Sequence, residues 1–130
     1  MAGIFSKIVS GEIPSHKIAE TEHFLAFLDI MPLAKGHVLV IPKKETDYFF
    51  DLENEELDGL MRFSKVVAIA IKKAIPCKKV GVTVIGLEVP HAHVHLIPIN
   101  HIDDMNFGKP KLHPSAAELE ETAAAIRACL

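Results

Sequence analysis

The sequence predicts an α+β fold: a mainly antiparallel sheet of about five strands, one long helix, and short N- and C-terminal helices. Short β-type runs follow one another with few residues between them, which suits hairpins and leaves no βαβ alternation. Only residues 54–75 carry sustained apolar spacing of three and four residues, which is typical of a long helix. The 130 residues, 49% of them hydrophobic, fit a single domain spanning residues 1–130.

The N-terminal half is expected to form a short helix and three strands. Ile4 to Val9 has helical spacing, and Ser10-Gly11 ends that helix. Strands are then expected over residues 17–21, 24–29 and 37–42, the last of which reads HVLVIP and closes at Pro42.

The long helix is expected to end before Pro76, and its apolar stripe should face the sheet. The stripe consists of Leu57, Leu60, Met61, Ser64, Val67, Ala68, Ile71 and Ile75. Phe63, Val66 and Ala70 fall outside it, which suggests that a second side of the helix is buried by another subunit.

The C-terminal half should add two strands, over residues 78–89 and 91–100, and a loop over residues 100–114. Ser115 and Glu118 form a capping box, which predicts a last helix at about residues 115–129, appended to the domain.

Charge and cysteine content exclude several classes of protein. The net charge of −3 gives no reason to expect nucleic acid or an anionic membrane as partner. Cys77 and Cys129 lie far apart without a CxxC motif, which indicates neither a disulfide framework nor a cysteine zinc site. The N-terminus lacks the apolar run of a signal peptide, and no run of about 18 apolar residues predicts a membrane span. We therefore expect a cytoplasmic protein.

The stretch VPHAHVHLIPI, residues 89–99, carries histidines at positions 91, 93 and 95. Successive side chains on a strand point to opposite faces, so His91, His93 and His95 would share one face and line an exposed or cleft surface. The apolar residues that alternate with them would face the core. Three imidazoles in strict alternation are hard to explain as structural residues, so we expect a functional site here.

A metal site is one interpretation of the three histidines, because histidine is a common zinc ligand. On an unbent strand His91 and His95 would lie about 13.5 Å apart, whereas zinc needs each ligand nitrogen at about 2.0–2.1 Å. One ion therefore cannot bind all three. Further ligands would have to come from Asp29, His37, His101 or His113.

The other interpretation is nucleophilic catalysis. Imidazole has a pKa near about 6.5, so it can attack an electrophile at neutral pH without an auxiliary base. Phosphorus suits it, because the N–P bond forms and hydrolyses readily. His93 would attack, while His91 and His95 would donate protons or hydrogen bonds to the phosphate oxygens or the leaving group.

The segment His91-Ala92-His93-Val94-His95-Leu96-Ile97 resembles the signature of the histidine triad (HIT) superfamily, His-φ-His-φ-His-φ-φ with φ apolar. IFSKIVSGEIPSHKIAE resembles the N-terminal helix and first strand of that family, and LAFLDIMPLAKGHVLVIPKK resembles its nucleotide-pocket segment. The resemblance covers most of the chain. It implies a HIT-like fold of the HINT-like branch, which contains nucleotide hydrolases and transferases.

The resemblance also implies roles for single residues. His93 matches the nucleophile, His95 a contact to the phosphate and leaving group, and His91 the member that supports the nucleophile. Asp29 matches the acid that holds the ribose hydroxyls, and His37 a further active-site histidine. An apolar clamp on the base is matched by Ile4, Phe5, Phe27, Ile30 and Leu39. Phe27 and Leu39 are equally explained as core residues, whereas for Asp29 a turn-capping role is the less favoured alternative.

The sequence departs from the family pattern at two places, the segment that contacts phosphate and the positions of the zinc ligands. The family's Gly-Gln-Ser/Thr segment, whose polar groups touch phosphate, is replaced by Gly86-Leu87-Glu88, and the upstream asparagine is missing from Val80-Gly81-Val82. Glu88, kept as a nucleotide-site candidate, would repel a phosphate if it faced the pocket, or could contact an amine leaving group or a histidine. No structural zinc is expected, because Ser6 stands where some bacterial members begin a CxxC and the long helix contains no histidine.

The expected function is hydrolysis or transfer at the α-phosphate of a nucleoside phosphoramidate or dinucleoside polyphosphate, through a nucleotidyl-histidine on His93. No cofactor is required, although magnesium could accompany a polyphosphate substrate. A purine nucleotide is the expected ligand by analogy, and a homodimer is expected through the long helix and a sheet edge. The alternative is a non-catalytic nucleotide-binding or interaction protein that keeps the fold, which Leu87 and Glu88 favour.

Overall fold

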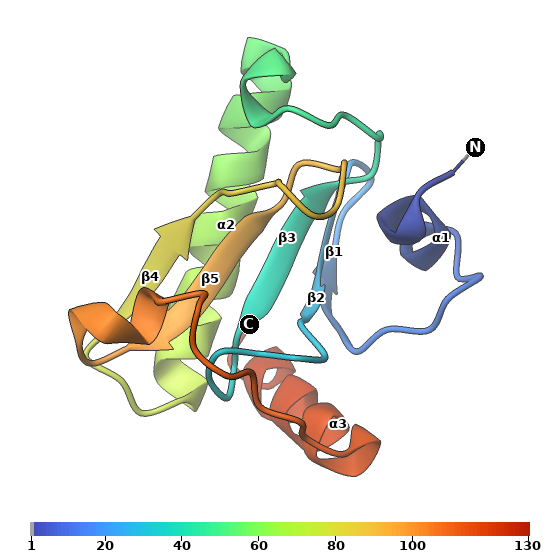
Figure 1. Cartoon of the computed structure of the whole chain (residues 1–130). Helices are drawn as coiled ribbons and strands as arrows, with labels where there is room; N and C mark the ends of the chain where they lie inside the picture. Colours follow the sequence, from blue (N-terminus) through green and yellow to red (C-terminus); the bar gives the residue numbers. More distant parts are fainter. Residues whose placement is uncertain (1) are drawn as a thin grey trace.

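The computed structural model describes residues 2–130 as one five-stranded sheet with helices on both faces (Figure 1). The helices are α1 (Ile4–Val9), α2 (Asn54–Ala74) and α3 (Ala116–Arg127). The strands are β1 (Lys17–Glu20), β2 (Phe24–Leu28), β3 (Val38–Pro42), β4 (Lys79–Thr83) and β5 (Val94–Ile99). Two short 3-10 helices, Phe49–Asp51 and Ile102–Met105, complete the described chain.

The strands lie in the order β1-β2-β3-β5-β4, and every neighbouring pair is antiparallel. Leu39 in the middle strand is opposite Phe27 on one side and His95 on the other. Residues opposite one another project from the same face of a sheet, so these three side chains share one face. The predicted fold class, α+β with a mainly antiparallel five-stranded sheet, is confirmed.

The two faces of the sheet are covered differently. The long helix α2 and helix α3 cover one face, and α1 lies over the other (Figure 1). Alternation along the strands explains this: in β3, Val38 and Val40 pack with α2 and α3, whereas Leu39 and Ile41 pack with α1. The histidine-bearing face is therefore the one that α1 covers.

Several boundaries and faces differ from the sequence prediction. Strand β4 ends at Thr83, and β5 begins only at Val94, so residues 84–93 are not strand. The expected loop of residues 100–114 contains a 3-10 helix. On α2, Met61 was expected to face the sheet but is 39% exposed, whereas Ala70, expected outside the stripe, is buried. Because α2 packs against both the sheet and α3, its buried face is rotated relative to the apolar face that the sequence predicts.

In residues 2–130 no helix combines the length and the apolar character that a membrane crossing needs.

A left-handed glycine immediately precedes His37, and it predicts a measurable packing effect. Gly36 has φ of 92°, and a Cβ there would lie 2.9 Å from Ile75 Cγ1 and 3.2 Å from Pro98 Cγ. Gly11 has φ of 84°, but a Cβ at that residue would meet nothing within 4 Å. We expect Gly11→Ala to cost about 1–2 kcal/mol from backbone strain alone, and Gly36→Ala about 1–3 kcal/mol more from overpacking.

Urea unfolding of the two glycine variants and the wild type measures both costs. Gly11→Ala is the matched control, because it shares the backbone conformation and lacks the crowding. Equal losses of unfolding free energy in the two variants would contradict the packing argument.

Candidate functional site

The three triad histidines lie at the start of β5, but only His95 is in the strand. His91 and His93 precede Val94, so the prediction that the whole triad stands on one strand is wrong. Of the two surfaces predicted for the imidazoles, exposed or in a cleft, the exposed one is wrong, since His91 is 1% exposed and His93 and His95 are 7% exposed. The side chains nevertheless converge: the ring centroids of His93 and His95 lie 4.8 Å apart.

Hydrogen bonds to Val89 within the segment, to Pro42 at the end of β3 and to Thr46 beyond it hold the irregular segment that carries His91. The His91 N–H donates to Val89 O at 2.8 Å, and the Ala92 N–H donates to Thr46 O at 2.7 Å. The His91 ring donates from Nε2 to Pro42 O at 2.7 Å, which leaves its buried Nδ1 without a partner among the described residues. These bonds replace the sheet ladder and fix the direction of the His91 carbonyl.

That carbonyl determines which nitrogen of His93 is reactive. The His91 O lies 2.7 Å from His93 Nδ1, and a carbonyl oxygen can only accept, so Nδ1 carries the proton. In the neutral ring Nε2 then holds the lone pair. Burial lowers the pKa of His93, which favours this neutral form. His93 is thus arranged as a nucleophile at Nε2.

A second pair of hydrogen bonds fixes the tautomer of His95. The Leu33 N–H donates to His37 Nδ1 at 3.1 Å, so the proton of a neutral His37 is on Nε2. That Nε2 lies 3.0 Å from His95 Nδ1, which must accept, and the proton of His95 is therefore on its own Nε2. Burial lowers the pKa of His37 to about 3 and that of His95 to about 4, so both rings are neutral at pH 7. The series of hydrogen bonds from Leu33 through His37 to His95 leaves His95 as a hydrogen-bond donor at Nε2.

Asp29 follows β2 and lies beside this pair. Its Oδ1 accepts the Met31 N–H at 2.9 Å, which is the turn-capping contact that sequence alone allows. Its Oδ2 lies 3.8 Å from His37 Nε2. Burial raises the pKa of Asp29, while the Met31 hydrogen bond and the charges of His93 and Lys111 oppose the rise. One carboxyl group therefore caps a turn and also borders the histidine cluster.

Helix α1 brings an aromatic side chain onto the triad. The Phe5 ring lies 5.1 Å from His93, 5.6 Å from His91 and 5.5 Å from Phe27, each in an edge-to-face arrangement. Glu45 holds the start of this helix, because its Oε1 accepts the Gly3 N–H at 2.8 Å and the Ser6 hydroxyl at 2.7 Å. Glu45 follows the same β3 end that anchors His91, so one segment positions both α1 and the triad.

The other predicted site residues divide into buried and exposed groups. Phe27 and Leu39 are buried together with Phe5 in the core cluster on this face. Ile4 and Ile30 are 51% and 62% exposed, at the ends of elements that border the cluster. Glu88 is exposed and takes part in no ion pair formed within residues 2–130. Their contacts with a ligand stay predictions.

A three-residue group could be taken for a metal site. Potential ligand atoms of Asp29, His37 and His95 lie within 4.8 Å of one another. A histidine nitrogen must lose its proton to bind a metal, and the Leu33 N–H places the proton of His37 on the nitrogen that faces the group. Zinc would have to break that backbone hydrogen bond or convert His37 to an anion. The hydrogen bonding favours a proton-donating chain here.

Two functional candidates were missed by sequence reasoning, and both lie between the 3-10 helix Ile102–Met105 and α3. The Phe107 ring lies 4.9 Å from the His95 ring and 6.3 Å from the His37 ring. Lys111 Nζ lies 5.8 Å from the centre of the Phe107 ring. The sequence signal was one aromatic residue in the loop of residues 100–114, and nothing local connects it to the triad.

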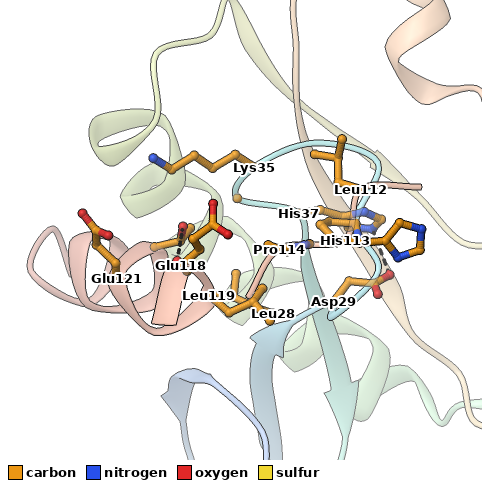
Figure 2. Close-up of a pocket in the computed structure, with 13 residues that line it drawn as sticks. Leu28, Asp29, Lys35, His37, Leu112, His113, Pro114, Glu118, Leu119 and Glu121 are labelled. Carbon is orange, nitrogen blue, oxygen red and sulfur yellow. Dashed lines mark hydrogen bonds and ion pairs between the residues drawn. The ribbon is translucent and has the colours of Figure 1, made fainter. Parts of the chain in front are cut away.

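Figure 2 shows a pocket beyond His37, between α3 and the loop that joins β2 to β3. Its volume is about 370 Å³, and its polar lining includes Lys35, His113, Glu118 and Glu121. The pocket shares Asp29 and His37 with the histidine cluster, whereas none of the triad histidines lines it.

The comparisons identify the family. The HIT domain profile matches residues 10–102. The chain belongs to the HIT family. The adenosine 5'-monophosphoramidase HNT1 of Saccharomyces cerevisiae is 42% identical over 98 residues, covering 75% of this chain and 62% of the yeast protein.

Two solved HIT structures match nearly the whole chain. A Hit-like protein of Bartonella henselae, described as involved in cell-cycle regulation, superposes with a TM-score of 0.85 at 36% identity and covers 98% of this chain and 96% of its own. A hypothetical histidine triad nucleotide-binding protein of Sulfolobus tokodaii has a TM-score of 0.82 at 29% identity, covering 96% and 89%. The predicted family and its fold are thereby confirmed.

Proposed function

We propose that this HIT protein hydrolyses or transfers nucleotide conjugates at the α-phosphate, with His93 as the nucleophile. The observation that carries the proposal is the hydrogen-bond pattern, which leaves a lone pair on His93 Nε2 beside a proton on His95 Nε2. A nucleophile attacks the phosphorus, and a hydrogen-bond donor stabilises the charge that develops on a poor leaving group. The likeness to a yeast adenosine phosphoramidase supports adenosine phosphoramidate as the first substrate to test.

The reaction would proceed in two steps. His93 Nε2 forms a bond to the α-phosphorus and the bond from phosphorus to the leaving nitrogen breaks, while the His95 Nε2–H hydrogen-bonds to that nitrogen, which takes up a proton from solvent water. Water then attacks the phosphorus, the bond to His93 breaks, and the proton of the attacking water returns to solvent. The products are the free amine and the nucleoside monophosphate. Asp29 would hold the ribose hydroxyls, and Phe5, Phe27 and Leu39 would form an apolar wall for a purine.

Release of AMP from adenosine phosphoramidate by the purified protein tests this function. We expect release at the same rate with and without a metal chelator, because no step uses a metal ion. Loss of activity with chelator and recovery with zinc would contradict the metal-free reaction. Binding of AMP without release from either a phosphoramidate or a dinucleoside polyphosphate would favour the non-catalytic alternative.

We also propose a homodimer formed through β4 and α2. Strand β4 is at the edge of the sheet, so one side of it has unpaired backbone groups. Val82 on β4 and Val66 and Ile69 on α2 are about half exposed. Light scattering should give a dimer mass for the wild type and a monomer mass for Ile69→Glu, and a monomeric wild type would contradict the proposal.

A further inference from the structure

The charge around the triad is poorly suited to a phosphate without further help. Burial lowers the pKa values of His37, His93 and His95, so these rings are neutral at pH 7. The ionisable group beside them is the carboxyl group of Asp29. A nucleotide phosphate is an anion, and binding it next to a carboxyl group requires a cation nearby to offset the repulsion.

Lys111 places an ammonium group at the edge of this cluster. Its Nζ donates to Phe107 O at 2.7 Å and lies over the Phe107 ring, whose other neighbours are His95 and His37. Its charge also acts on Asp29 and His37. One aromatic ring thus separates the ammonium from the histidine pair, and the side chain is half-buried.

Lys111 differs from the nearby Lys109 in having no carboxylate partner. Lys109, two residues earlier, pairs with Asp103 at 2.7 Å. None of the ion pairs formed within residues 2–130 includes Lys111, and its one hydrogen bond there is to a neutral carbonyl. An ammonium has three N–H donors, so two remain for a ligand. A half-buried cation in this state is suited to an anion.

We propose that Lys111 binds the phosphate of the nucleotide and makes the site select nucleotides over nucleosides. In this chain Gly86-Leu87-Glu88 offers no polar donor side chain before the triad, and Leu87 is 89% exposed. Lys111 instead belongs to the segment after the 3-10 helix Ile102–Met105, which follows the C-terminal end of β5. The positive charge would therefore come from a segment that joins β5 at the end opposite the triad. The inference rests on the proposed function for the ligand class, but it requires binding only and not hydrolysis.

Calorimetric titration with AMP and with adenosine tests the proposal, using the wild type, Lys111→Met, Lys111→Arg and Lys109→Met. We expect Lys111→Met to weaken AMP binding about tenfold and to leave adenosine binding unchanged, because one charge-assisted hydrogen bond is lost. Lys111→Arg should retain most of the AMP affinity. Lys109→Met, which removes a nearby paired lysine, should change neither. Added salt should weaken AMP binding more in the wild type than in Lys111→Met.

Equal weakening of AMP and adenosine by Lys111→Met would overturn the inference, since it would indicate a structural role. So would unchanged AMP affinity in that variant, or a wild type that does not bind AMP. The AMP-release assay separates this result from the proposed function. AMP binding that depends on Lys111, without hydrolysis, would support the inference and contradict the proposed hydrolase function. Hydrolysis by a wild type whose AMP affinity is unchanged in Lys111→Met would support the hydrolase function and contradict the inference.

Discussion

Replacing His93 with alanine is expected to lower the rate of AMP release from adenosine phosphoramidate by at least about a thousandfold, because the attacking nitrogen is removed. The substitution should leave AMP binding largely intact, since in the proposed reaction His93 attacks phosphorus whereas other groups hold the ribose, base and phosphate. Its pocket lies against Phe5, so a modest loss of stability is also expected from the cavity. Chromatographic measurement of AMP release, with calorimetry for AMP binding, checks both parts.

His23→Ala is the matched control for this experiment. The His23 side chain is 71% exposed, so its removal should change neither activity nor stability. A covalent AMP adduct on the wild type, seen by intact-protein mass spectrometry after rapid quenching, should be absent from His93→Ala. Equal AMP release by wild type and His93→Ala would defeat the nucleophile assignment for this substrate.

Acid should destabilise the fold, with His37 as one of the main causes. Burial lowers the His37 pKa to about 3, whereas the unfolded chain has the ordinary value of 6.5. Between these two pH values the unfolded state binds the proton and the folded state does not, so stability is full above pH 6.5 and falls as the pH drops toward 3. At pH 4 the difference amounts to about 3 kcal/mol from His37 alone.

Urea unfolding of the wild type and of His37→Leu at pH 7 and at pH 4 measures this contribution. His37→Leu is less stable at pH 7, because it leaves the Leu33 N–H and His95 Nδ1 without their partner. Its further loss between pH 7 and pH 4 should be smaller than that of the wild type by about 3 kcal/mol. The exposed His23→Leu variant should follow the wild type. Parallel pH dependence in His37→Leu and the wild type would contradict a buried, neutral His37.

Local sequence patterns predicted the helices and strands well. They failed where contacts between residues distant in sequence determine the boundary of an element. The capping box of Ser115 and Glu118 forms as predicted, because both partners belong to one helix turn. Strand β5, in contrast, begins three residues later than expected, because Pro42 and Thr46, far away in sequence, supply the hydrogen bonds of residues 91 and 92. Alternation in the sequence cannot reveal such a replacement of the sheet ladder.

The candidate site shows the same division. The residue types at 91, 93 and 95 and the resemblance they carry were sufficient to predict the family. The contacts of Glu45 with α1 and of Phe107 with His95 were not predictable, since they join segments separated by many residues and neither has a periodic signature.

The sequence by itself determined the fold class, the order of the elements and the family, because periodicity, capping and the histidine spacing are local properties of the chain. Only the tertiary structure decided the chemical state of the site. The tautomers of His93 and His95 depend on partners at residues 91 and 37, and the neutral charge of the rings depends on burial under α1 and Phe107. Proton position and charge follow from which groups meet in space, and the fold brings those groups together.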